Sequence, residues 1–216
     1  MATLTQSLKI SVAAACLAAS GAVSATLLGV VPGQPLLNYD NGVLAYDATS
    51  DRFGISADPI TILFPPFANV NAPEQVSINI EIDSAGNLVG GVPGDDLVIT
   101  GDVQAPGPLF SGVLLTGEII GFGFMDSGGL IDLYDFQFVV TGGFLASFYA
   151  GSDIGVTTAS NDSTFTGDFA VDFGGGASGN IGPVSPGLPN PAPEPATLAL
   201  FGLSLAGLRW SRRKKV

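Results

Sequence analysis

The chain lacks the side chains on which most thiol and imidazole chemistry depends. It has no histidine and a single cysteine, Cys16, which lies in an apolar N-terminal stretch. Catalysis by Cys–His or Ser–His pairs is therefore excluded in the body of the chain, as are zinc sites with histidine or thiolate ligands. If the N-terminal stretch is removed, no disulfide can form, and the protein must fold on its hydrophobic core alone.

Basic residues are nearly absent between the two ends of the chain. All 19 acidic residues lie between Asp40 and Glu194, and Arg52 is the only basic residue in that span. A surface of this kind repels phosphate backbones, so nucleic acid is not an expected partner. It attracts cations, above all Ca²⁺. The simplest interpretation of the bias is solubility in an extracellular setting.

Residues 1–25 have the parts of a secretory signal peptide. Lys9 is followed by an apolar stretch, and Val23 and Ala25 then stand at the −3 and −1 positions of a small-residue cleavage site. The apolar run is too short to span a membrane. We therefore predict a signal helix that the Sec translocon exports and that signal peptidase removes after Ala25. Lipidation at Cys16 is the alternative interpretation.

The body of the chain, residues 26–173, has the periodicity of β-strands. Val76, Ile78, Ile80 and Ile82 alternate with polar residues, which gives an extended strand one apolar face. No long segment has the apolar spacing of an amphipathic helix. The sequence therefore predicts an acidic all-β domain, either an antiparallel β-sandwich or a partly open barrel. Further apolar segments, bounded by Gly, Pro, Asp or Asn, cover residues 36–39, 43–46, 97–99, 109–115, 118–125, 130–140, 144–149 and 165–173.

Two short stretches predict tight turns, and a third predicts the end of the domain. Asn41-Gly42 is a strong signal for a type I′ turn between two strands. The composition of residues 84–87 predicts the turn of a second hairpin. After Phe173 the apolar alternation stops and glycine and proline dominate. We therefore expect a Gly/Pro-rich linker over residues 174–192.

Adjacent acids offer a weak signal for catalysis. Asp95 with Asp96, and Asp132 with Asp135, superficially resemble the two carboxylates of a glycoside hydrolase. Acids are so frequent here that such pairs arise by chance, and those after Pro93 are typical of a turn. The body also has no tryptophan to form a platform for a sugar ring. We therefore assign no catalytic residue and expect no enzyme.

Calcium is the one cofactor for which the sequence offers candidate ligands, and no metal site is assigned. Asn79, Glu81 and Asp83 have the spacing of the start of an EF-hand loop, but they alternate with isoleucines as in a strand. The loop at residues 126–129 and Asp153 are better candidates because they lie among glycines.

The tail combines three features in a fixed order. Pro193, Glu194 and Pro195 precede an apolar segment over residues 196–208, for which Pro195 is a suitable first residue of a helix. Such a helix is roughly 20 Å long, shorter than the ~30 Å hydrocarbon core of a bilayer. Residues suited to the membrane interface and to the cytoplasmic side follow it: Arg209, Trp210, Arg212, Arg213, Lys214 and Lys215.

Residues 193–216 resemble the PEP-CTERM sorting signal of exopolysaccharide-producing Gram-negative bacteria. The resemblance implies an exosortase, a membrane-embedded cysteine protease-transpeptidase, as the processing partner. It also implies transient anchoring in the inner membrane until the chain is cut near Glu194, followed by delivery to the cell surface or extracellular matrix. An ordinary short C-terminal membrane anchor is the alternative interpretation of the tail.

Together these features predict an exported, non-enzymatic protein of the cell surface or extracellular matrix, with exopolysaccharide as a further partner. The alternative is a secreted carbohydrate-binding module or glycan-active enzyme delivered by the same tail. The absence of histidine and of tryptophan in the body favours the first.

Overall fold

The computed structural model describes residues 26–63, 68–103 and 110–185. The predicted signal helix and the predicted C-terminal hydrophobic helix both lie outside these residues. Within them, the all-β prediction is confirmed. The chain forms strands and one short 3₁₀ helix, with these bounds: β1 Leu36–Asp47, β2 Arg52–Leu63, β3 Ala68–Ile82, β4 Leu88–Gly91, β5 Leu97–Val103, β6 Phe110–Met125, β7 Ile131–Gly142, η1 Ala146–Tyr149, β8 Asp153–Asn161 and β9 Phe173–Val184.

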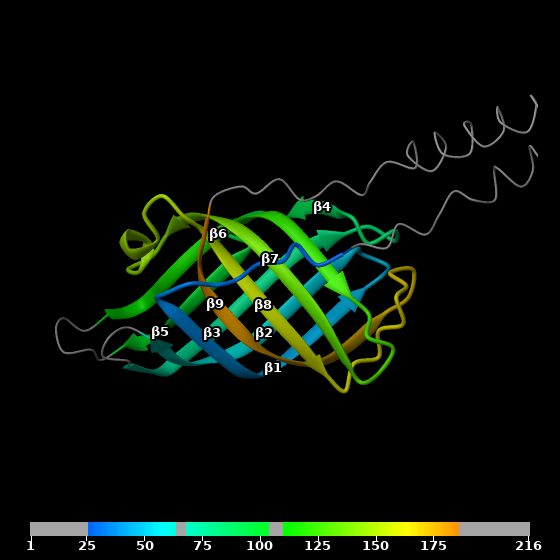
Figure 1. Cartoon of the computed structure of the whole chain (residues 1–216), viewed down its shortest axis with the longest axis horizontal. Coiled ribbons are helices and arrows are strands. Elements are labelled where there is room, and N and C mark those ends of the chain that lie inside the picture. The colour runs from blue at the N-terminus through cyan, green and yellow to red at the C-terminus, as the bar shows by residue number, and fades with distance from the viewer. Residues whose placement is uncertain (1–25, 64–67, 104–109, 186–216) are drawn as a thin grey trace, which may run out of the picture.

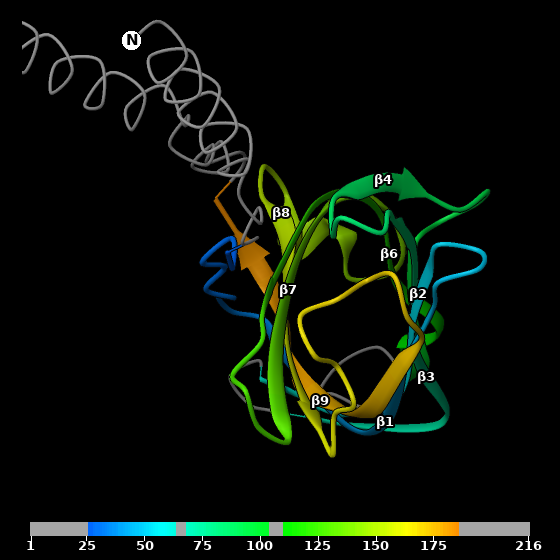
Figure 2. The same cartoon turned by 90° about the vertical axis from the view of Figure 1, so that its right-hand side faces the viewer.

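The strands close into a barrel (Figures 1 and 2). All strand pairs are antiparallel, in the order β2-β1-β9-β8-β7-β6-β5-β3, and β2 also pairs with β3. The short β4 adds to β3 outside the ring. The barrel is thus closed by eight strands, which corrects the expectation of a sandwich or a partly open barrel. Closure pairs the two edges that an open sheet would expose.

Apolar side chains fill the inside of the barrel. Ile78, Ile80 and Ile82, which alternate along β3, are 0% exposed. A cluster of aromatic rings packs around Phe53, whose ring centroid lies 5.3–6.2 Å from those of Phe122, Tyr134, Phe136 and Phe173. An eight-stranded barrel is just wide enough for side chains to fill it. The interior is therefore a packed core.

The predicted turn at Asn41-Gly42 is wrong, because β1 continues through it. Asn41 does adopt the left-handed conformation that such a turn needs, with φ of 54°. Here the conformation produces a β-bulge, which shifts the register of β1 against both β2 and β9. The bulge leaves no room beside Gly42: a Cβ there would lie 2.7 Å from the Ala177 carbonyl oxygen and 2.7 Å from the Ala57 Cβ.

Gly42→Ala is therefore expected to lower the free energy of unfolding by about 1–3 kcal/mol, the usual cost of overpacking a tight site. Gly54→Ala is the matched control, because the nearest atom to a Cβ at Gly54 is 3.5 Å away, in ordinary contact. Urea unfolding of the two variants measures the difference. Equal stability of the two variants would contradict the assigned bulge geometry.

The predicted domain end near Phe173 is also wrong. Residues 173–184 form β9, which pairs with β1 on one side and β8 on the other. At Gly179 the neighbouring strands leave no space for a side chain, because a Cβ there would overlap the Thr157 carbonyl oxygen and approach the Tyr39 hydroxyl to 2.7 Å. The expected linker is thus a strand up to Val184, and residues 186–192 lie outside the described residues.

Four other predicted segments differ from the structure. The predicted segments 109–115 and 118–125 are continuous: residues 110–125 form one long strand, β6, and residue 109 lies outside the described residues. Residues 144–149 contain η1 in place of a strand. Most of 165–173 is a loop between β8 and β9 that crosses one end of the barrel (Figure 2), where Phe165 and Phe169 are buried. The apolar spacing of Phe165 and Phe169 therefore arises from two buried rings at the end of the barrel, and not from a strand.

Candidate functional site

The predicted processing residues lie outside the described part of the chain. This holds for the signal-cleavage residues Val23 and Ala25, for Pro193, Glu194 and Pro195, and for the interface and basic residues from Arg209 to Lys215. Among the residues that the structure describes, no helix is long and apolar enough to cross a membrane.

The candidate carboxylate pairs are not assembled. Asp132 faces the barrel interior together with Tyr134 and is 0% exposed, whereas Asp135 faces outward from the same strand. Asp96 is buried and accepts hydrogen bonds from the amides of Val92 and Ile119, at 2.8 and 2.9 Å. Asp95 lies next to Asp96 in the chain, and its carboxylate accepts a bond from the Thr141 hydroxyl. Burial, Asp96 and Asp95 raise the pKa of Glu118, so these acids are near one another, but Asp96 is buried and committed to two backbone amides. Asp132 and Asp135 lie on opposite sides of β7, so they do not flank one space as glycoside hydrolysis requires.

Many aspartates serve instead as acceptors for backbone amides in turns and loops. The carboxylate of Asp83, for example, accepts bonds from the amides of Ala85 and Asn87 at 2.9 and 2.8 Å. Asparagine and aspartate commonly stabilise turns in this way. Part of the excess of acidic residues therefore stabilises turns and loops, in addition to the role in solubility expected from the sequence. The aspartates with this role are Asp47, Asp83, Asp96, Asp126, Asp132, Asp135, Asp168 and Asp172.

The candidate calcium ligands are separate from one another. Asn79 and Glu81 lie within β3, and Asp83 forms the turn after it, so an EF-hand is excluded. Asp126 accepts a bond from the Gly128 amide, and Asp153 accepts one from the Gln137 side chain. No group of three or more acidic, histidine or cysteine side chains that could hold a metal occurs in the described residues.

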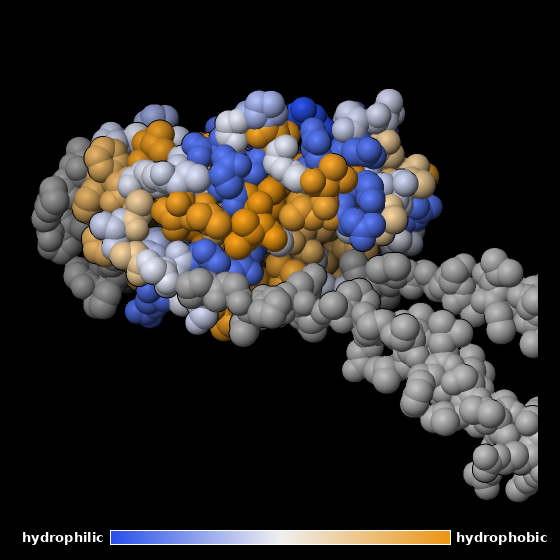
Figure 3. Space-filling model, turned by 90° about the horizontal axis from the view of Figure 1, so that it is seen from above, coloured by the Kyte–Doolittle hydropathy of each residue, from blue (hydrophilic) through white to orange (hydrophobic). Residues whose placement is uncertain are grey.

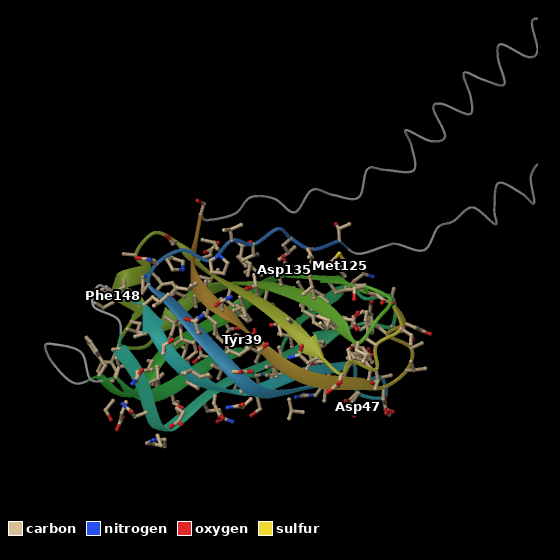
Figure 4. All side chains as sticks on the ribbon, turned by 60° about the horizontal axis from the view of Figure 1, so that its bottom comes forward. Tyr39, Asp47, Met125, Asp135 and Phe148 are labelled. Carbon is tan, nitrogen blue, oxygen red and sulfur yellow. The ribbon has the colours of Figure 1, made fainter. Side chains whose placement is uncertain are left out.

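A segment that packs across the outside of the barrel was not predicted from the sequence. The segment of residues 26–35, here called the strap, crosses β6, β7, β8 and β9 before β1 begins (Figure 1). Its amides at Leu28, Gly29 and Val30 donate hydrogen bonds to the Asp135 carboxylate, at 2.9, 2.8 and 3.2 Å. Asp135 is only 3% exposed and lies beside the strap in Figure 4. Burial raises the pKa of Asp135, and the three amides act in the opposite direction.

Glycines in the barrel wall make room for the strap. A Cβ at Gly121 would approach the Leu28 side chain to 3.0 Å, and one at Gly123 would lie 2.7 Å from the Leu28 nitrogen. Likewise, a Cβ at Gly155 would collide with the Val30 side chain, and one at Gly182 would collide with the Gly33 backbone. The Gly33 amide also donates a 2.8 Å bond to the Pro183 carbonyl oxygen of β9. The strap therefore contacts the barrel wall at several points between Leu28 and Gly33.

A groove of about 460 Å³ runs beside the strap. Leu27 and Val30 border it, and Leu133, Thr157 and Ala159 of β7 and β8 line it. The face of the barrel seen in Figure 3 carries a band of apolar surface between hydrophilic patches. A second groove, on the wall formed by β1, β2 and β3, is more polar and includes Asp58 and Glu74.

Sequence reasoning missed the strap because hydrogen bonds to its backbone leave no pattern in its side chains. The available signal was Asp135 itself, a carboxylate in the middle of the apolar run 130–140. A charged residue on a strand between apolar neighbours requires partners that compensate its burial.

Comparison with known proteins identifies the tail. A family model described as the PEP-CTERM protein-sorting motif matches residues 191–214. The chain carries a PEP-CTERM sorting motif. The matched range includes Pro193, Glu194, Pro195 and Trp210, the residues on which the predicted resemblance rests. No curated protein and no solved structure matches the chain.

The PEP-CTERM motif implies an exported protein of the cell surface that an exosortase processes. The described barrel and the motif are joined by residues 186–190, a short and proline-containing stretch. The motif therefore indicates where the protein is sent, and the barrel is the folded part that the structure describes.

Proposed function

We propose that the protein is a non-enzymatic component of the cell surface or extracellular matrix, associated with exopolysaccharide and delivered as a folded barrel by its PEP-CTERM motif. The motif at residues 191–214 is the observation that carries the proposal. The signal peptide brings the chain to the Sec translocon, and the tail holds it transiently in the inner membrane until an exosortase cuts it.

The barrel supports the non-enzymatic part of the proposal. Its interior is filled by aromatic and aliphatic side chains, so it offers no lumen to a substrate. Many of its aspartates bind backbone amides and are committed to turns. Neither groove on the described wall combines a pair of acids with an exposed aromatic platform. These features favour a structural or adhesive role over glycan cleavage.

Glu194→Ala is expected to block processing, because the change removes the central residue of the triplet that the exosortase reads. The full-length chain should then accumulate in the inner membrane, as should a variant that lacks residues 212–215. Intact and peptide-mapped masses of the protein from the envelope and the culture medium measure this. Pro189→Ala, outside the matched range, is the control and should be processed normally.

Unchanged release of the Glu194→Ala protein, ending near Pro195, would count against processing at the motif. Release of reducing sugar from the host's exopolysaccharide by the purified protein would count against the non-enzymatic role. The two readouts are independent, so one part of the proposal can fail without the other.

A further inference from the structure

Three buried polar atoms at one end of the barrel form no hydrogen bond with any of the described residues. They are Asp132 Oδ2, Tyr134 OH and Ser160 Oγ, on side chains that are 0%, 1% and 0% exposed. Buried polar atoms are rarely left in this state, because each has lost its hydrogen bonds to water without a replacement. This end of the barrel therefore needs a partner for these atoms.

An equally buried aspartate and three other tyrosines of the barrel are satisfied. Asp96 is as deeply buried as Asp132, yet both of its oxygens accept a backbone amide. The hydroxyls of Tyr39, Tyr46 and Tyr149 each bond to a protein oxygen. Tyr134, by contrast, lies near the Ser163 side chain but without hydrogen-bond geometry. Among the described residues, one other buried side-chain oxygen lacks a partner, Glu74 Oε2, and it lies on β3 beside the second groove. The other three unsatisfied atoms are all on the paired strands β7 and β8.

The three side chains converge on one end of the barrel from these two neighbouring strands. Asp132 and Ser160 are directly paired residues of β7 and β8, and both face inward. Burial raises the pKa of Tyr134, and the nearby negative charge of Asp132 raises it further. Gly175 of β9 makes room for the Ser160 hydroxyl, which a Cβ at that position would overlap. The β8–β9 loop covers this end of the barrel (Figure 2).

The described residues supply no positive charge to this region. Arg52 is the only basic residue in the described part of the chain, and it pairs with Glu81 on the surface at 3.7 Å. One oxygen of Asp132 accepts the Ser127 amide at 3.0 Å, which leaves the other oxygen uncompensated. A buried carboxylate is costly unless a cation or several donors offset its charge.

We propose that Asp132, Tyr134 and Ser160 bind a small, hard metal cation through oxygen ligands, with Asp132 as the charged ligand. Carboxylates, hydroxyls and backbone carbonyls are the ligands that such ions accept. Calcium is the ion to test first, because extracellular calcium modules bind with dissociation constants of about 10⁻⁴–10⁻³ M, and a site with one carboxylate is expected to bind weakly. This site adjoins the loop at 126–129, whose Ser127 amide bonds to Asp132, but its proposed ligands are different residues from those of the loop and from Asp153.

The test is thermal unfolding of the full chain, purified in a mild detergent and freed of metal with a chelator. Ca²⁺, Mg²⁺, Na⁺ and K⁺ are then titrated at constant ionic strength set by choline chloride. At 100 times the dissociation constant, the binding ion should raise the melting temperature by roughly 5–10 °C. Asp132→Asn should abolish this rise and, without metal, should melt at or above the wild type.

Asp96→Asn is the matched control, because it makes the same change at a buried aspartate whose oxygens are both satisfied. It should melt lower than the wild type and keep the full response to the ion. Tyr134→Phe gives a second readout should Asp132→Asn not fold, and should weaken the response without abolishing folding. If no ion raises the melting temperature, or if Asp132→Asn responds like the wild type, the proposal is wrong and water alone satisfies these atoms.

Discussion

Asp135→Ala is expected to release the strap from the barrel wall and to lower the free energy of unfolding by about 3 kcal/mol or more. The change removes the acceptor of three amide hydrogen bonds, and bonds to charged groups contribute roughly 1.5–3 kcal/mol each. The cost of burying the carboxylate offsets part of that sum. Chemical unfolding measures the loss, and limited proteolysis should show new cleavage within residues 26–33.

Asp168→Ala is the control for this prediction. Asp168 lies in an exposed loop and accepts a single amide bond, from Ala170 at 2.8 Å. Its replacement should cost about 1 kcal/mol or less and should leave the strap resistant to protease. If both variants lose the same stability and the strap stays protected in each, Asp135 does not hold the strap.

The strap also shows why part of this fold could not be predicted from sequence. Local alternation was enough to find the second half of β3, residues 76–82, and its turn into β4, because the isoleucines there all face one core. The strap and β9 have no such pattern. Their positions depend on backbone hydrogen bonds and on glycines that allow chains to approach closely, as Gly179 does against Thr157. Composition alone cannot distinguish these glycines from those of a linker.

Closure of the barrel is equally non-local. It requires β1 to pair with β9, for example Leu37 with Ile181, and no short sequence window contains such contacts. The pairing of β2 with β3, by contrast, is between consecutive strands. Asn41-Gly42 illustrates the conflict: the dipeptide takes its preferred left-handed backbone, but the neighbours on both sides turn it into a bulge. The pairing of β1 with β2 and β9 therefore determines that this local conformation forms a bulge and not a hairpin turn.

The tail is the opposite case. A sorting motif is read as a linear sequence, so its residues could be predicted without any fold, and the match over residues 191–214 agrees with the predicted tail. The candidate cation site lies between these extremes. Asp132 was noticed in the sequence, but as one of a catalytic pair, and only the paired strands bring Ser160 next to it.

Phe53→Ala is expected to lower the free energy of unfolding by about 3–5 kcal/mol, the usual cost of removing a large aromatic side chain from a core. Phe53 is 1% exposed and contacts rings from β6, β7 and β9 at once, including Phe122, Phe136 and Phe173. Because these strands lie far apart in the sequence, its loss weakens packing across the barrel. Urea unfolding measures the change, and the near-ultraviolet circular dichroism of the aromatic cluster should fall with it.

Val43→Ala is the control, because Val43 is 64% exposed on β1 and its truncation should change stability by no more than about 0.5 kcal/mol. A Phe53→Ala protein with nearly wild-type stability would mean that the barrel interior is loosely packed. The filled core, which supports a structural role over a binding lumen, would then lose its basis. A large loss confined to Phe53→Ala would instead show that the barrel is held together from the inside, by rings that meet across strands without any disulfide.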